Sequence, residues 1–322
     1  MKHIYITDLR DGMSLFGEYF AVKSFKKLLT KQEKTYFDLE LSDKTGNIRG
    51  KIWPDHLNTC EIVTEGEVVA IDALIESYNG ALQLKITALK IESNFLMADL
   101  QPVSKKDQKQ MLTIVTTSIQ KVKNKHLKSL LNNIFTPDFL KDFSEASASY
   151  RLHHAYKSGL LEHTTEMLVF SETILSQYPK MNRDILITGI LLHDIGKMIE
   201  YQTTTTITIS TEGKLLGHIF IGASYIKEQA SKDIPEDLLN EILHLVLSHH
   251  GSLEFGSPIL PKTAEAIALS SIDDTSAKIN SSYVAIHDNG EEAEFTTYYR
   301  HLGTELYRSP YLNNLTNEDI PF

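Results

Sequence analysis

An apolar segment that ends in two ionisable residues constrains this chain more than any other feature. The segment has apolar side chains on nearly every side, which is typical of a helix buried all round; they are Ile185, Ile187, Ile190, Leu191, Leu192 and Ile195. His193 and Asp194 lie side by side at its end. Burying an unpaired carboxylate costs several kcal/mol, so both side chains need a partner that offsets this cost. A metal cation would satisfy both.

One His-Asp pair arises by chance in many proteins, so the prediction depends on the residues around it. Further histidines and an aspartate lie on or beside apolar helical segments in the second half of the chain: His163, His218, His249, His250 and Asp273. This set of imidazoles and carboxylates predicts a metal centre. His249 and His250 are adjacent and would point about 100° apart on a helix, so one of them could contact substrate or water instead.

The set contains more ligands than one ion needs, which predicts two metal ions with Asp194 as the bridging carboxylate. The expected division is one ion on His163, His193 and Asp273, and one on His218, His249 and His250. Imidazoles with carboxylates suit Mn²⁺, Fe²⁺, Co²⁺ or Zn²⁺ and are unusual for Mg²⁺ alone, and manganese is our first expectation.

Lys197 is a second candidate catalytic residue beside Asp194. It follows His193 by about one helical turn and could donate to a phosphate oxygen. The alternative is an ordinary lysine that faces solvent after the helix.

Several short segments around these residues resemble a known family. They are Gly159-Leu-Leu-Glu-His163-Thr, Leu192-His-Asp-Ile-Gly-Lys197, Gly213-Lys-Leu-Leu-Gly-His218-Ile, Ser248-His-His-Gly251 and Gly256-Ser-Pro258. The set resembles the HD-domain metal phosphohydrolases and, among them, the YhaM-type 3′-to-5′ exoribonucleases of bacteria. The resemblance covers nearly the whole chain, because that family also carries an N-terminal OB-fold. It implies a metal-dependent phosphodiesterase that degrades single-stranded RNA from its 3′ end to mononucleotides.

One segment departs from the family pattern. That pattern reads His-Ile-Asp-Asn-Leu-Asp-Ala-Lys, where this chain has Ser271-Ile-Asp-Asp-Thr-Ser276-Ala-Lys278. The metal-binding aspartate is kept at Asp273, while Ser271 and Ser276 replace a histidine and a second aspartate. These changes put the level of activity in question, but not metal binding.

Residues 1–95 show the alternation of β-strands. Residues 37–41 and 48–53 alternate apolar and polar side chains around a turn rich in Gly, Asn and Asp. Residues 68–75 and 81–86 form a second expected pair, and a short helix could fill residues 55–63. Five strands with a helix between the third and the fourth are the organisation of an OB-fold barrel.

The third expected strand carries candidate RNA-binding residues. Alternation turns Arg49, Lys51 and Trp53 away from the barrel core, and Tyr36 could join them. OB-folds hold single strands by stacking bases on aromatic rings and pairing phosphates with cations. The alternative is that Trp53 covers the barrel and the two cations are ordinary surface.

Lysines crowd residues 105–128 almost without acidic neighbours, and apolar residues recur there at helical spacing. We therefore expect a multi-domain α+β chain: an OB-fold nucleic-acid-binding domain over 1–95, a basic helical linker over 96–150, and an all-α HD domain over 151–322. A lysine-rich face is commonly just solvated. The alternative is a path that leads a polyanion from the barrel to the metal centre.

Composition sets further limits. A chain of 322 residues can bury two cores. Cys60 is the single cysteine, which excludes an intrachain disulfide and favours a reducing cytoplasm. No stretch reads as a signal peptide or a membrane span. The net charge of −10 argues mildly against nucleic-acid binding, so the local distribution of charge matters more.

Three functions remain open. The leading hypothesis is an exoribonuclease that acts on single-stranded RNA, with single-stranded DNA as an alternative substrate. The family resemblance also implies a homo-oligomer. The second is an HD hydrolase of free nucleotides or cyclic dinucleotides. The third is an RNA- or DNA-binding protein whose HD centre is degenerate. The barrel and the basic segment favour a polymer, since a small-molecule hydrolase has little use for either.

Overall fold

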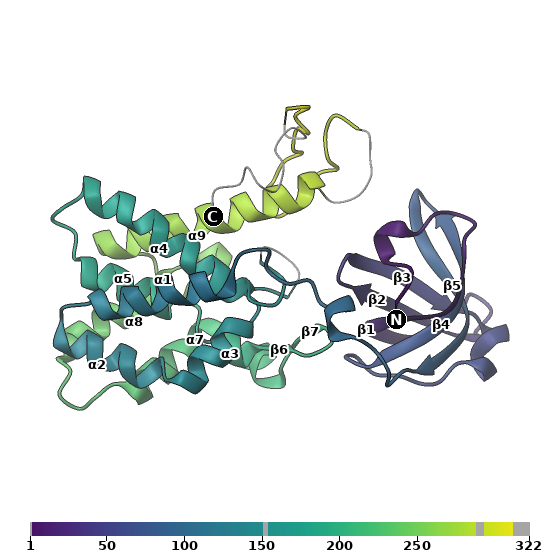
Figure 1. Ribbon diagram of the computed structural model, residues 1–322, viewed down its shortest axis with the longest axis horizontal. Coiled ribbons are helices and arrows are strands. Elements are labelled where there is room, and N and C mark those ends of the chain that lie inside the picture. The colour runs from purple at the N-terminus through teal and green to yellow at the C-terminus, as the bar shows by residue number, and fades with distance from the viewer. Residues whose placement is uncertain (1, 151–153, 288–292, 312–322) are drawn as a thin grey trace. The chain divides into compact units, whose positions relative to one another are not determined.

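The computed structural model of the protein describes residues 2–150, 154–287 and 293–311. It divides into two compact units (Figure 1). One unit is Met1–Val103 with Gln202–Thr208, and the other is Ser104–Tyr201 with Ile209–Phe322. Within the described residues, no helix is both long and apolar enough to cross a membrane.

The first unit is a closed barrel with strand order β1-β2-β3-β5-β4. Its strands are β1 (Ser14–Leu29), β2 (Thr35–Asp43), β3 (Gly46–Ile52), β4 (Val68–Tyr78) and β5 (Ala81–Ile91). β3 and β5 pair in parallel, and the other pairs are antiparallel. A short 3-10 helix, Pro54–Thr59, follows β3 where a helix over 55–63 was expected. The five-stranded OB-fold predicted from the alternation is confirmed.

The barrel core follows from the period of two in each strand. In β3, Ile48, Gly50 and Ile52 are buried, whereas Arg49 is exposed and Lys51 is half-buried. The turn between β4 and β5 is tight because Asn79 and Gly80 adopt positive φ values of 51° and 80°, as a two-residue hairpin turn requires.

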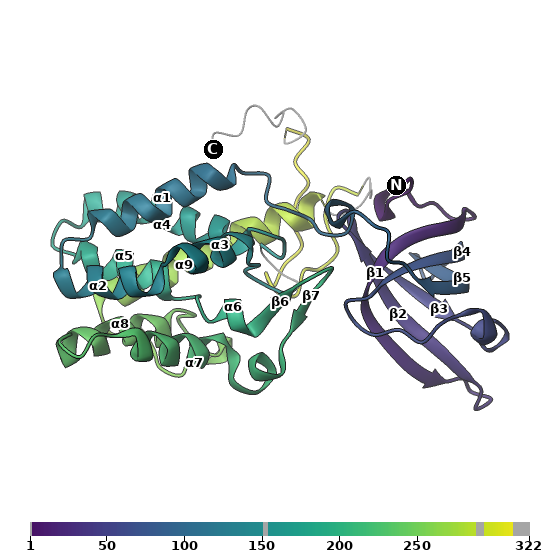
Figure 2. The same ribbon diagram turned by 60° about the horizontal axis from the view of Figure 1, so that its bottom comes forward.

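The second unit is helical. Its helices are α1 (Gln108–Lys121), α2 (Lys125–Ile134), α3 (Pro137–Glu145), α4 (Gly159–Gln177), α5 (Arg183–Leu192), α6 (Lys197–Glu200), α7 (Thr211–Gln229), α8 (Glu236–Ser248) and α9 (Ala264–His287). Every residue from Ile185 to Leu192 of α5 is buried, which confirms the helix buried all round. α4, α8 and α9 pack against α5, and α7 packs against α8 (Figure 2).

The basic segment also contributes to the helical core. Helices α1 to α3 place apolar residues such as Val115, Leu127 and Phe143 in the same cluster as α5. α1 begins at Gln108, where the Asp107 side chain caps its first turn by accepting from the N–H groups of Lys109 and Gln110. The division of the chain at residues 95 and 150 stays a prediction.

A small hairpin interrupts the helices between α6 and α7. Its strands are β6 (Tyr201–Thr203) and β7 (Ile207–Ile209), and its tip belongs to the first unit. There the Thr205 hydroxyl donates a hydrogen bond to the carbonyl of Gly66.

Candidate metal centre

Helix α5 delivers the His-Asp pair into the interior of the helical unit. His193 is the C-cap of α5, its N–H donates to the carbonyl of Gly189, and the chain then turns into α6. His193 is fully buried and Asp194 is 2% exposed. Because the helix is buried on all sides, its end opens into protein and not into solvent.

A first cluster of ligand atoms forms around His193. His163 comes from α4 and Asp273 from the middle of α9, and one ligand atom of each of the three lies within 4.8 Å of the others. His163 Nε2 lies 3.3 Å from His193 Nε2 and 3.1 Å from Asp273 Oδ1. Asp194 Oδ2 lies 3.2 Å from His193 Nε2.

A second cluster lies on the other side of Asp194. It joins His218 of α7 with His249 and His250 at the end of α8, again within 4.8 Å. Asp194 Oδ1 lies 3.6 Å from His218 Nε2 and 3.5 Å from His249 Nε2. One carboxylate therefore turns one oxygen to each cluster, and the structure brings together all seven residues predicted as ligands from the sequence.

Backbone carbonyls orient three of the imidazoles. The carbonyl oxygens of Ile190, Val246 and Phe255 lie 2.8, 2.6 and 2.7 Å from Nδ1 of His193, His249 and His250, respectively. A carbonyl can only accept, so each Nδ1 carries the proton and each Nε2 keeps its lone pair. These rings are ready to bind a cation through Nε2.

Glu200 orients the fourth imidazole. It ends α6, and its Oε2 lies 2.9 Å from Nδ1 of His218. Gly217, with φ of 70°, breaks α7 immediately before His218, so that a new helical segment begins at this residue. Glu200 was not predicted from the sequence, because nothing in its local pattern distinguishes it from a surface glutamate.

The electrostatics of the site differ from one imidazole to the next: burial alone would lower the pKa of His193, but the carboxylate of Asp194 outweighs it and raises that pKa. Burial lowers the pKa of His163 and of His218. Burial alone would raise the pKa of Asp194, but the charges of Lys197 and His193 outweigh it and hold that pKa well below its usual range. Deprotonated carboxylates and neutral imidazoles are the forms that bind metal.

The site contains buried polar atoms without partners. Within the part of the chain that the structure describes, Asp194 Oδ1, His218 Nε2 and His249 Nε2 are buried and have no hydrogen-bond partner. Leaving such atoms unsatisfied is costly unless an ion or water binds them. Three lone-pair donors that face one space fit a divalent cation.

Lys197 does not face solvent. Its side chain is buried, and Nζ lies 2.6 Å from Asp194 Oδ2. The alternative of an ordinary solvent-facing lysine is therefore wrong. His244, by contrast, lies outside both clusters, where its Nε2 accepts from the N–H of Lys262.

The candidate RNA-binding residues lie on the barrel. The rings of Tyr36 and Trp53 stack with centroids 5.3 Å apart and an interplanar angle of 24°. Lys51 Nζ lies 5.5 Å from the Trp53 ring and 5.6 Å from the ring of Tyr78. Tyr78 was not predicted, because it lies at the end of β4, far from β3 in sequence.

The strand register gives the two cations acidic neighbours. Arg49 pairs with Glu40 and Lys51 pairs with Asp38 across β2 and β3. Cross-strand pairs of opposite charge are common stabilising features of sheets. The aromatic stack is therefore the more specific mark of a binding face than the two cations.

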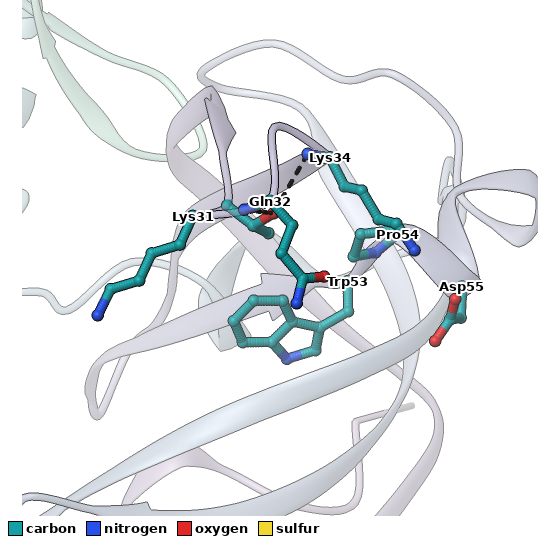
Figure 3. A pocket seen from close by; sticks show the side chains of 7 residues that line it. Lys31, Gln32, Lys34, Trp53, Pro54 and Asp55 are labelled. Atoms are coloured by element: carbon teal, nitrogen blue, oxygen red, sulfur yellow. Dashed lines mark hydrogen bonds between the residues drawn. The ribbon is translucent and has the colours of Figure 1, made fainter.

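Trp53, one ring of this stack, also lines a pocket (Figure 3). It has a volume of about 400 Å³ and is lined by Thr30, Lys31, Gln32, Lys34, Trp53, Pro54 and Asp55. The Gln32 side chain reaches toward the Trp53 indole. The turn between β1 and β2 thus adds polar groups and lysines to the edge of the aromatic face.

Comparison with known proteins agrees with both units. Residues 160–278 match the HD domain family, and residues 15–92 match the family described as OB-fold nucleic acid binding domain. The chain is 32% identical over 271 residues to the 3′-5′ exoribonuclease YhaM of Geobacillus sp. (strain WCH70), which covers 81% of this chain and 82% of the relative. The YhaM of Shouchella clausii is 33% identical, with 87% of each chain covered. This chain belongs to the YhaM family.

Membership in the YhaM family confirms the resemblance seen in the sequence, and the HD domain implies binding of a divalent metal ion. A third member, from Bacillus pumilus, is 31% identical over 286 residues, covering 87% of this chain and 89% of the relative.

The two serines that depart from the YhaM pattern have different environments. Ser271 is exposed, and its hydroxyl donates to the carbonyl of Ile267 at 2.8 Å. Ser276 is 1% exposed, and its hydroxyl lies between His163 and Glu166. Asp274 is exposed and pairs with Lys278. Of these departures, only Ser276 touches the centre.

Gly196 permits the close packing that brings His218 to Asp194. A Cβ at this position would lie 2.7 Å from the Gly222 N, and closer still to the carbonyl oxygen of His218. Gly196→Ala should therefore push α7 away and lower the free energy of unfolding of the helical unit by about 1–3 kcal/mol. Urea unfolding followed by helical circular dichroism measures this loss.

Gly222→Ala is the matched control on the other side of the same contact. Its Cβ would lie 3.2 Å from the Gly196 N, a milder clash. Alanine also gains about 1 kcal/mol over glycine inside a helix. The net change should be small, and equal stability of both variants and the parent would contradict the close approach.

Proposed function

We propose that this chain hydrolyses single-stranded RNA from its 3′ end, releasing mononucleotides at a two-metal centre. The observation that carries the proposal is the carboxylate of Asp194, which faces a separate cluster of ligand atoms with each of its oxygens. Such a bridging geometry is typical of two-metal phosphoryl-transfer sites. Membership in a family of 3′-5′ exoribonucleases supports the substrate and the polarity.

The proposed ligands divide as the two clusters do. One ion would be held by His163, His193 and Asp273, the other by His218, His249 and His250, with Asp194 shared. Manganese is the metal that we propose and test first, and iron, cobalt or zinc would bind through the same imidazole and carboxylate atoms. When bound, the two ions supply Lewis-acid activation of water and neutralise phosphate charge.

The protein's own groups prepare the site for an anion. In four rings Nδ1 is bonded to a carbonyl or a carboxylate, so Nε2 presents its lone pair to the centre. Lys197 adds a buried ammonium on the Asp194 side. We propose that this ammonium also donates to a phosphate oxygen of the substrate, which would place positive charge where negative charge develops.

The barrel would hold the strand upstream of the reacting end. Bases would stack on the Tyr36–Trp53 pair, and Arg49 and Lys51 would contact phosphates. Stacking on an aromatic ring is tolerant of sequence, as a degradative enzyme needs. Single-stranded DNA offers the same bases and phosphates and is a second substrate to test.

Asp194→Asn should remove hydrolysis and lower bound manganese from two ions per chain to at most one, because the bridging charge is lost. Metal per chain is measured by mass spectrometry after dialysis, and hydrolysis with labelled RNA. His244→Gln, on α8 outside both clusters, is the control and should keep metal and rate. Full occupancy and rate in Asp194→Asn would refute the two-metal assignment.

The direction of attack is tested with RNA labelled at its 5′ end. We expect a ladder of shortening products with manganese present, and slower decay when a phosphate blocks the 3′ hydroxyl. Circular RNA should survive, and internal cuts in it would make the chain an endonuclease. Faster turnover of free nucleotides or cyclic dinucleotides would favour the second hypothesis, and bound metal without any hydrolysis the third.

Trp53→Ala should weaken binding of single-stranded RNA about tenfold, since one stacked base contributes about 1–3 kcal/mol. Fluorescence anisotropy with EDTA present measures binding without hydrolysis. Ile62→Ala removes another exposed apolar side chain of the barrel unit, 77% exposed, and should bind as the parent does. Trp53→Ala should still cleave a small phosphodiester at the parental rate, and unchanged RNA affinity would assign Trp53 to the barrel surface alone.

A further inference from the structure

Ser276 links a metal-cluster histidine to a second carboxylate. Its Oγ lies 2.9 Å from His163 Nδ1 and 2.7 Å from Glu166 Oε2. The histidine is fully buried, the serine is 1% exposed, and the Glu166 side chain is 20% exposed. His163 and Glu166 are three residues apart on α4, on the same face of that helix, and Ser276 reaches them from α9.

The direction of each hydrogen bond follows from the number of protons. An ionised Glu166 can only accept, so the single hydroxyl proton of Ser276 is donated to Oε2. The serine oxygen must then accept from Nδ1–H of His163. The proton of the ring therefore sits on Nδ1, and Nε2, the atom 3.1 Å from Asp273, keeps its lone pair.

Glu166 is held as an anion. Burial alone would raise its pKa, but the hydrogen bonds and charges of His154 and Lys106 outweigh burial and lower the pKa to about 2. Lys106 Nζ lies 2.8 Å from Glu166 Oε1 and 3.5 Å from Glu162 Oε1, and His154 Nε2 lies 3.3 Å from Glu166 Oε2.

His154, Glu162 and Glu166 have the spacing of a further metal site, but an ammonium already lies there. Lys106 touches both carboxylates and balances their charge. Tyr156 donates to Glu162 at 3.0 Å, and Asn280 of α9 donates to Tyr156 at 3.2 Å. This group is therefore a support for Glu166, whose Oε2 accepts from Ser276 and also lies 3.3 Å from His154 Nε2.

The contact between Ser276 and Glu166 also explains why an aspartate is unsuited to position 276 in this chain. A carboxylate there would lie against Glu166, since the present hydroxyl is 2.7 Å from Oε2. Two buried carboxylates at such a distance repel each other, and one of them must take up a proton. Serine avoids the repulsion, and its hydroxyl connects the carboxylate of Glu166 to the His163 ring by two hydrogen bonds.

We propose that Glu166, acting through Ser276, is the positioning carboxylate that fixes the tautomer and the orientation of His163 for metal binding. This relay from Glu166 through Ser276 to His163 rests on the metal centre proposed above. It adds the carboxylate that orients His163. Partners of this kind, bonded to a ligating histidine, typically change metal affinity 10–100-fold when they are removed.

The test is manganese binding by isothermal titration calorimetry with the full chain, without substrate. The parent should bind two ions, and failure to do so would refute the proposed centre itself. Ser276→Ala should weaken one of the two sites about 10–100-fold. Ser271→Ala is the control: Ser271 lies on the same helix, five residues before Ser276, and is exposed. Among the described contacts its hydroxyl donates only to a backbone carbonyl, so this variant should bind manganese as the parent does.

Moving the carboxylate from position 166 to position 276 distinguishes a positioning role of Glu166 from a packing role. Ser276→Asp alone should bind poorly because of Glu166, whereas Ser276→Asp with Glu166→Gln lets the new carboxylate accept directly from Nδ1 and should restore the weakened site. Glu166→Gln alone preserves shape and should still weaken that site, which decides the question if Ser276→Ala does not fold. Parental affinity in Glu166→Gln, or no rescue in the double variant, would overturn the relay.

Discussion

The burial of one carboxylate governs the helical unit. Asp194 sits at the end of a helix with no solvent-facing side, so its charge cannot be stabilised by water. Each of its oxygens faces imidazoles, and Lys197 contacts one oxygen as well. The buried carboxylate therefore attracts cations strongly, because electrostatic interactions in an apolar core are stronger than in water.

Helix ends provide much of the orientation in this centre. The last carbonyls of a helix lack partners within it. At the ends of α5 and α8, the carbonyl three residues before the histidine accepts from its Nδ1, at Ile190 for His193 and at Val246 for His249. The same local device thus satisfies a free carbonyl and fixes a ring. His218 and His163 lie away from such ends and depend on Glu200 and Ser276 instead.

The barrel works by a different principle. Its outer face combines a stacked aromatic pair with lysines around a pocket, while acidic residues lie opposite Arg49 and Lys51 in the sheet. Aromatic stacking does not depend on net charge, so such a face can contact bases even though the chain as a whole carries −10. This agrees with a strand-holding role that needs little sequence preference.

The local sequence alone predicted most of the secondary-structure elements and the residue types that make up the candidate metal centre. Alternation predicted the barrel strands, and the all-apolar run before His193 predicted a buried helix, because both patterns are properties of neighbouring residues. The tertiary structure decided which oxygen of Asp194 faces which cluster, that Lys197 is buried, and that Glu200, Glu166 and Ser276 support the rings. Ser276 and His163 are 113 positions apart and Glu200 resembles any surface glutamate, so their roles depend on long-range packing that no local pattern encodes.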